Sequence, residues 1–171
     1  MAELETFDFA SFRGDNAHHL VSGFDYIHAV HHTQQLSADF ALCMAKLYWP
    51  EFVRVDSWIF VKENFDEAYY LSLLESDNSP AKNQFWMNLL EVTGLFENLS
   101  MPQSTVVANA LAGSWNAKLA SEFGPSFAQA RAIVDDEGCE VFVTIGFSEK
   151  RLKGFGCAKW ILGCSMWSGL K

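Results

Sequence analysis

Apolar residues recur at two kinds of spacing along this chain, and each kind predicts a different secondary structure. In three segments they return every three or four residues, the period of a helix that buries one face, and capping residues predict a fourth helix. Residues 1–36 show neither spacing clearly, so we expect loops and short extended pieces there. The predicted helices are 37–49, 64–75, 80–93 and 104–123.

Polar residues mark where two of these helices should begin. Asn64 stands three residues before Glu67, as in a capping box, where the cap side chain accepts a hydrogen bond from the first turn. Ser79 is followed by Pro80, and proline favours the first position of a helix. We therefore expect Asn64 and Ser79 to be N-caps.

The second kind of spacing, in which apolar and polar residues alternate, predicts two hairpins. β-Branched and aromatic residues flank Asp56 and Ser57 within 52–61, which indicates a tight turn between short strands. Residues 127–134 and 140–147 resemble two further strands around an acidic turn. The sequence therefore predicts an α+β fold, with several helices packed on a small antiparallel sheet and a helix–hairpin unit near the C-terminus.

Charge is distributed very unevenly between the two parts of the chain. Residues 1–149 hold all 21 acidic residues and seven of the 12 basic ones, a formal charge of −14. Residues 150–171 hold the other five basic residues, and the net charge of the whole chain is −9. An acidic body favours a basic partner and disfavours nucleic acid, whose phosphates attract Lys and Arg.

This change in composition suggests two regions. We predict a single acidic domain at 1–149 and a basic, apolar tail at 150–171. The tail contains Trp160 and Trp167, so we expect it to pack on its own body or on a second copy.

Other features bear on where the protein acts. The four cysteines are scattered, and we expect free thiols. Acidic residues stand near the start, where a secretion signal would have basic ones, and no apolar run reaches the roughly 18–20 residues of a membrane span. We therefore expect a cytoplasmic protein that does not bind membranes.

All five histidines lie between His18 and His32, which raises metal binding or acid–base catalysis as an alternative. His28 and His32 would share a helix face, and Asp25 or Asp39 could supply a third ligand. The residues between these two histidines include no glutamate, so the zinc-protease motif is absent. We predict no metal, no cofactor and no catalytic residue, and a metal-binding protein or enzyme built on 18–32 stays open as an alternative.

Acidic and aromatic side chains offer a different kind of site. Four carboxylates gather at the turn of the predicted C-terminal hairpin, where they form either a solvated turn or a contact for a basic partner. Tryptophan is common among the anchor residues of protein interfaces. The candidate partner-binding residues are Trp58, Asp135, Asp136, Glu137, Glu140, Trp160 and Trp167.

Three segments, taken in order, carry a resemblance to a known group of proteins. They are Trp49–Val53 followed by Asp56, Trp115–Leu119 with Phe123, and Val141–Thr144. This order resembles small bacterial α+β proteins, some of which look like immunity proteins of toxin systems, over about residues 38–147. The shared motifs are packing motifs, so the resemblance implies a fold and a class but no site residue.

Together these features favour a non-enzymatic protein that binds a basic protein partner, and the resemblance implies an immunity protein that neutralises a toxin. A homo-oligomeric structural protein, with a homodimer formed through the tail, is the other alternative.

Overall fold

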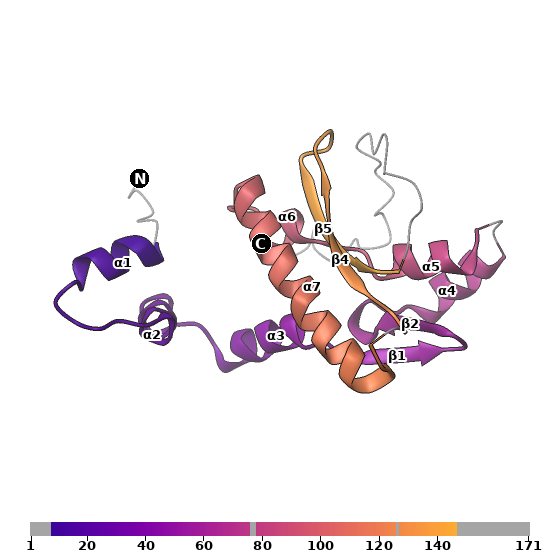
Figure 1. The fold of residues 1–171 in the computed structure, drawn as a ribbon, viewed down its shortest axis with the longest axis horizontal. Coiled ribbons are helices and arrows are strands. Elements are labelled where there is room, and N and C mark those ends of the chain that lie inside the picture. Colours follow the sequence, from indigo (N-terminus) through magenta and orange to yellow (C-terminus); the bar gives the residue numbers. More distant parts are fainter. Residues whose placement is uncertain (1–7, 76–77, 126, 147–171) are drawn as a thin grey trace. The chain divides into compact units, whose positions relative to one another are not determined.

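The computed structural model of this protein describes residues 8–75, 78–125 and 127–146, which Figure 1 draws as a coloured ribbon. The chain divides into two compact units between Ala45 and Lys46. The sequence pattern did not predict this division, and the boundary that it did predict, at 149/150, lies outside the described residues. The two units differ in how much apolar surface they bury.

The first unit contains α1 (Phe9–Asp15), α2 (Gly23–Gln34) and the beginning of α3 (Ala38–Tyr48). The expectation of loops and extended pieces at 1–36 is therefore wrong. Polar caps rather than a wide apolar stripe define these helices: Asp8 accepts hydrogen bonds from the first turn of α1, and Ser22 begins α2 with a capping box. No side chain in the described part of this unit is buried.

The second unit contains the remaining helices and strands that the structure describes. In chain order they are β1 (Phe52–Val55), β2 (Trp58–Val61), the 3₁₀ turn η1 (Lys62–Asn64), α4 (Glu67–Leu74), α5 (Pro80–Met87), β3 (Leu90–Glu91), α6 (Val92–Leu95), α7 (Met101–Phe123), β4 (Ala130–Asp135) and β5 (Glu140–Ile145).

The centre of this unit is an antiparallel sheet with the strand order β3-β5-β4, and α7 lies across one of its faces (Figure 1). The core between helix and sheet includes Leu111, Trp115, Leu119, Val143 and Ile145. The predicted α+β fold, with its helix followed by a hairpin, is confirmed.

The long helix α7 begins earlier than its apolar pattern suggests. We predicted a start at Ser104, but this side chain is completely buried inside the helix, and Ser100 is the N-cap. Gln103 Oε1 accepts from the Ser100 backbone N–H at 2.9 Å, which completes a capping box. At the other end Gly124 has a φ of 91°, which glycine adopts without strain.

The predicted tight turn between β1 and β2 is confirmed, since Val55 pairs with Trp58 across Asp56 and Ser57. This hairpin is attached to α5 through buried side-chain amides. Asn88 Oδ1 accepts from the Val61 N–H at 2.7 Å, and Asn88 Nδ2 donates to the Ile59 carbonyl at 2.9 Å. Asn88 thus satisfies backbone groups at the edge of β2 that no strand in the described part of the chain pairs.

Two other predicted helix boundaries are also wrong. Asn64 lies in the 3₁₀ turn, and Asp66 caps α4 by accepting from the Tyr69 N–H at 2.6 Å. The helix capped by Ser79 does begin at Pro80, but it ends at Met87 rather than continuing to 93. The residues beyond it form β3 and α6, because pairing with β5 satisfies the backbone of Leu90 and Glu91. No helix in the described part of the chain has the length and apolar character that crossing a membrane would require.

Candidate functional site

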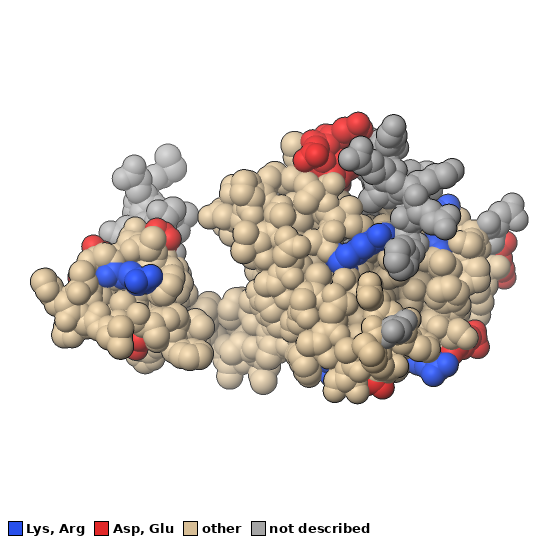
Figure 2. All heavy atoms as spheres, viewed as in Figure 1, with Lys and Arg blue, Asp and Glu red and all other residues tan. Residues whose placement is uncertain are grey.

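The turn end of the β4–β5 hairpin gathers acidic side chains from two strands and the loop between them. Asp135 pairs with Glu140 across the last register position, and Asp136 and Glu137 are exposed on the turn. Figure 2 shows a compact red patch of Asp and Glu residues at this end of the unit. Four of the seven predicted partner-binding residues therefore lie together, as the sequence suggested.

Asp135 differs from a solvated turn residue, because only 5% of its surface is exposed. Its Oδ1 accepts a hydrogen bond from the Glu137 N–H at 3.1 Å, which stabilises the turn. Its Oδ2 is buried and has no hydrogen-bond partner among the described residues. A buried carboxylate oxygen in that state favours a nearby cation or proton donor.

Glu140 is directed toward the same place. A Cβ atom built on Gly138 would lie 3.0 Å from Asp135 Oδ2 and 3.1 Å from Glu140 Oε2, so the two oxygens flank one small glycine. Burial raises the pKa of the Glu140 carboxyl above its ordinary value, and the negative charges of Glu91 and Asp135 raise it further. A positively charged group placed at this end of the hairpin would therefore stabilise the ionised carboxylates.

Glu91 belongs to this group of carboxylates, and the sequence analysis did not identify it. It reaches the site because β3 pairs with β5, which places Glu91 opposite Phe142. Thr93 Oγ1 donates to Glu91 Oε1 at 3.3 Å and accepts from the Val141 N–H, also at 3.3 Å. The available signal was Glu91 itself, a charge within a segment that we had assigned to one continuous helix.

Trp58 does not join the acidic group. It is half-buried on β2 and packs against an apolar cluster that contains Phe60 and Tyr70. Gln84 connects β2 to the opposite end of the β4–β5 hairpin, since its Nε2 donates to the Ile59 carbonyl and its side chain lies beside Gly146. Trp58 and the acidic turn thus form separate surfaces, and Trp160 and Trp167 lie outside the described residues.

The histidine region forms part of the first unit. His28 and His32 lie on one face of α2 with their ring centroids 6.3 Å apart. Asp25, one of the two expected third ligands, instead accepts hydrogen bonds from Ser22 in the capping box of α2. Among the described residues, no group of three or more His, Cys, Asp or Glu side chains could hold a metal ion.

A hollow of about 450 Å³ lies in the same unit, beside α1. Arg13 and His19 are the titratable side chains in its lining, and the other residues there are small or apolar. This hollow brings together neither a nucleophile with a base nor two carboxylates, so the acidic hairpin end is the better candidate site.

Comparisons of the chain with protein-family models, with curated proteins and with solved structures give no match. The features of this chain that bear on its function are therefore its fold and the chemistry of the acidic hairpin end.

Proposed function

We propose that this protein is a non-enzymatic, cytoplasmic protein that binds a basic protein partner through the acidic end of the β4–β5 hairpin. The observation that carries the proposal is the convergence of carboxylates at this end, with Asp136 and Glu137 exposed on the turn. A lysine or arginine from a partner would meet these two directly, and Glu140 and Asp135 lie at their base.

Electrostatics supports this choice of partner. Burial and two neighbouring negative charges disfavour the ionised form of Glu140, and a cation placed beside it would offset part of that cost. Rim carboxylates such as Asp136 and Glu137 act mainly on the rate of association and on its salt dependence. The net charge of −9 adds long-range attraction for a basic protein and repulsion for nucleic acid.

The resemblance to immunity-like proteins suggests one class of partner, a toxin whose basic surface the hairpin covers. Immunity proteins need no catalytic group, because they act by occupying a surface of the toxin. In this proposal the partner is toxic when it is produced alone, and co-production of this chain restores growth.

The test begins with capture of partners from an extract of the native cell on immobilised protein, followed by purification of each candidate. Each purified candidate is then titrated against the wild-type chain and against the Asp136→Asn/Glu137→Gln variant by calorimetry. We expect weaker binding and a smaller salt dependence in the variant, because two contacts to cations are lost.

A matched control removes the same charge elsewhere. Glu75 and Glu97 are exposed and belong to other parts of the second unit, so Glu75→Gln/Glu97→Gln should bind like the wild type. If both double variants weaken binding equally, only net charge matters, and the hairpin end is not the binding site. A purified partner that shows no toxicity when produced alone would contradict the immunity class.

A further inference from the structure

The β3-β5-β4 sheet has a second face, opposite α7, that combines apolar and acidic side chains. Strand pairing places Ile133 opposite Phe142 and Asp135 opposite Glu140, and it adds Glu91 from β3 beside Phe142. Side chains alternate between faces along a strand, so these five residues share one face while Val141 and Val143 face the helix. We call Glu91, Ile133, Asp135, Glu140 and Phe142 the outer face.

We propose that the outer face is the docking surface for residues 150–171 of the same chain. In this arrangement apolar side chains of the segment pack on Ile133 and Phe142, and a Lys or Arg side chain of the segment pairs with Asp135. The inference goes beyond the proposed function and does not depend on it, because Asp136 and Glu137 remain exposed on the turn for an outside partner.

Burial at the outer face is the first observation that supports a covering segment. Phe142 is only 4% exposed, yet it belongs to neither of the two apolar clusters that the described residues form. Helix α5 covers the part of this sheet face near Gly146, where Thr144 Oγ1 donates to the Phe85 carbonyl at 2.7 Å. The part toward the turn, which holds Phe142 and Asp135, is the part that residues 150–171 would cover in this proposal.

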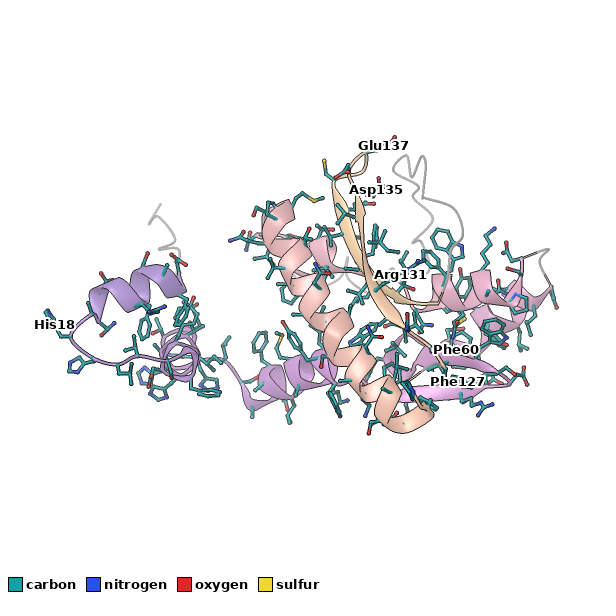
Figure 3. All side chains as sticks on the ribbon, viewed as in Figure 1. His18, Phe60, Phe127, Arg131, Asp135 and Glu137 are labelled. Carbon is teal, nitrogen blue, oxygen red and sulfur yellow. The ribbon has the colours of Figure 1, made fainter. Side chains whose placement is uncertain are left out.

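Asp135 is the second, independent observation. Its Oδ2 is buried without a hydrogen-bond partner among the described residues, and Figure 3 shows Asp135 close to the turn with Arg131 farther along the same strand. An unpaired buried carboxylate is costly, and a lysine or arginine within hydrogen-bonding distance is its usual compensation in proteins. A segment that is both apolar and basic would match these two observations.

Residues 150–171 have that composition. They contain Trp160, Ile161 and Leu162 together with all five basic residues beyond 149. They also begin close by, since β5 is followed directly by Gly146 and Lys150 stands four residues later. A strand of six residues is about 20 Å long, and an extended segment covers about 3.3 Å per residue, so this segment can return along the whole outer face.

Cross-linking in the full-length chain tests the docking directly, because the segment contains Cys157 and Cys164. Both test variants are made in a starting protein that carries Cys43→Ser and Cys139→Asn, which removes the two exposed cysteines. Of Cys157 and Cys164, only one is kept at a time. Ile133→Cys then places a thiol on the outer face. The matched control is Val134→Cys, the next residue along β4, which is 43% exposed and belongs to the opposite face.

We expect a short bismaleimide to link Ile133→Cys to Cys157 or Cys164 within one chain. The product should have lost both free thiols, as a thiol assay measures, and should keep the mass of a monomer. Val134→Cys should give little of this product. Links between two chains would overturn the proposal in favour of a second copy on this face. Equal linking of both variants, or of neither, would also overturn it, because the segment would then have no fixed position.

A second measurement tests the charge pair. Replacing Lys150, Arg151, Lys153 and Lys159 by Gln should lower the Tm of the wild-type chain by several degrees. In the Asp135→Asn background the same replacements should have a clearly smaller effect, because the pair is already broken. Equal effects in both backgrounds would contradict a contact with Asp135.

Discussion

At the scale of single residues, the side-chain amide of Asn88 forms hydrogen bonds with backbone groups that a neighbouring strand would normally pair. Asn88 is completely buried, and its amide accepts from Val61 N–H and donates to the carbonyls of Ile59 and Gln84. Leaving one buried backbone group unpaired costs about 1–3 kcal/mol. Gln84 Nε2 also donates to the Ile59 carbonyl, so Asn88→Ala leaves mainly the Val61 N–H unpaired. We therefore expect this variant to lower the free energy of unfolding by about 1–3 kcal/mol, as measured by urea denaturation.

Asn109 provides the comparison for that measurement. It is exposed on α7, and its Nδ2 donates to the Thr105 carbonyl at 2.8 Å. Asn109→Ala should change stability by no more than about 0.5 kcal/mol, as exposed substitutions usually do. If the two alanine variants are equally stable, Asn88 does not hold β2 against α5.

Glu140 gives a prediction about pH at the same scale. Its pKa is raised in the folded protein, first by burial and then by Glu91 and Asp135, so the folded state binds its proton more tightly than the unfolded state. The contribution of this group to stability is therefore present below its ordinary pKa of 4.5 and is lost as pH rises through the raised value. Stability measured over this pH range should fall less in Glu140→Gln than in the wild type.

Glu51 should behave in the opposite way and serves as the contrast. A hydrogen bond from Lys62 at 2.6 Å lowers the pKa of Glu51, so its contribution is present above the ordinary value and is lost as pH falls. Glu51→Gln should therefore lower stability above pH 4.5 by a constant amount and make the fall in stability toward acid pH less steep than in the wild type. A Glu140→Gln profile parallel to the wild type would show that the acidic cluster is not coupled in the folded protein.

At the scale of secondary-structure elements, α7 organises the second unit through Trp115. This side chain is 1% exposed, and its Nε1 donates to the Leu47 carbonyl at 2.9 Å, which ties the end of α3 to α7. Truncating a buried tryptophan costs about 3–5 kcal/mol through lost burial and the cavity left behind. Trp115→Ala should show that loss in thermal or urea unfolding.

Trp49 is the matched control for this substitution. It is 51% exposed, and Lys118 Nζ lies 5.4 Å from its ring centroid. A contact of this kind at an exposed site is worth about 0.5–1 kcal/mol, so Trp49→Ala should cost far less than Trp115→Ala. Similar losses for both variants would contradict the role assigned to α7.

The elements also show what the sequence could reveal. Helices with a wide apolar face, such as α3 and α7, were predicted because apolar residues repeat along them with the helical period. The β1–β2 turn was predicted because β-branched and aromatic residues flank Asp56 and Ser57, and in the structure Asp56 tolerates a φ of 53°. Elements defined by other forces were missed: α1 and α2 depend on caps, and β3 exists only because β5 lies beside it.

The same limit applies to the candidate site. The acidic turn was predictable because its residues are adjacent in sequence and follow an alternating strand pattern. Its chemistry was not predictable, since the burial of Asp135 and the approach of Glu91 arise only from tertiary packing. A composition argument can locate charge along a chain, but it does not show which carboxylates lose their water.

At the scale of the whole molecule, the two units should differ strongly in local stability. The described residues of the first unit bury no side chain, whereas α7 and β5 contain several fully buried ones. Local opening requires little free energy where few apolar contacts are lost, and it approaches global unfolding in a packed core. Hydrogen exchange followed by mass spectrometry should therefore show fast exchange in α1 and α2 and strong protection in α7 and β5.

The reference is each peptide's exchange rate in denaturant, which removes differences in intrinsic rate. Protection in α2 equal to that in α7 would contradict this view, because Phe24 and Ile27 would then be covered in solution although they are 83% and 62% exposed in the structure.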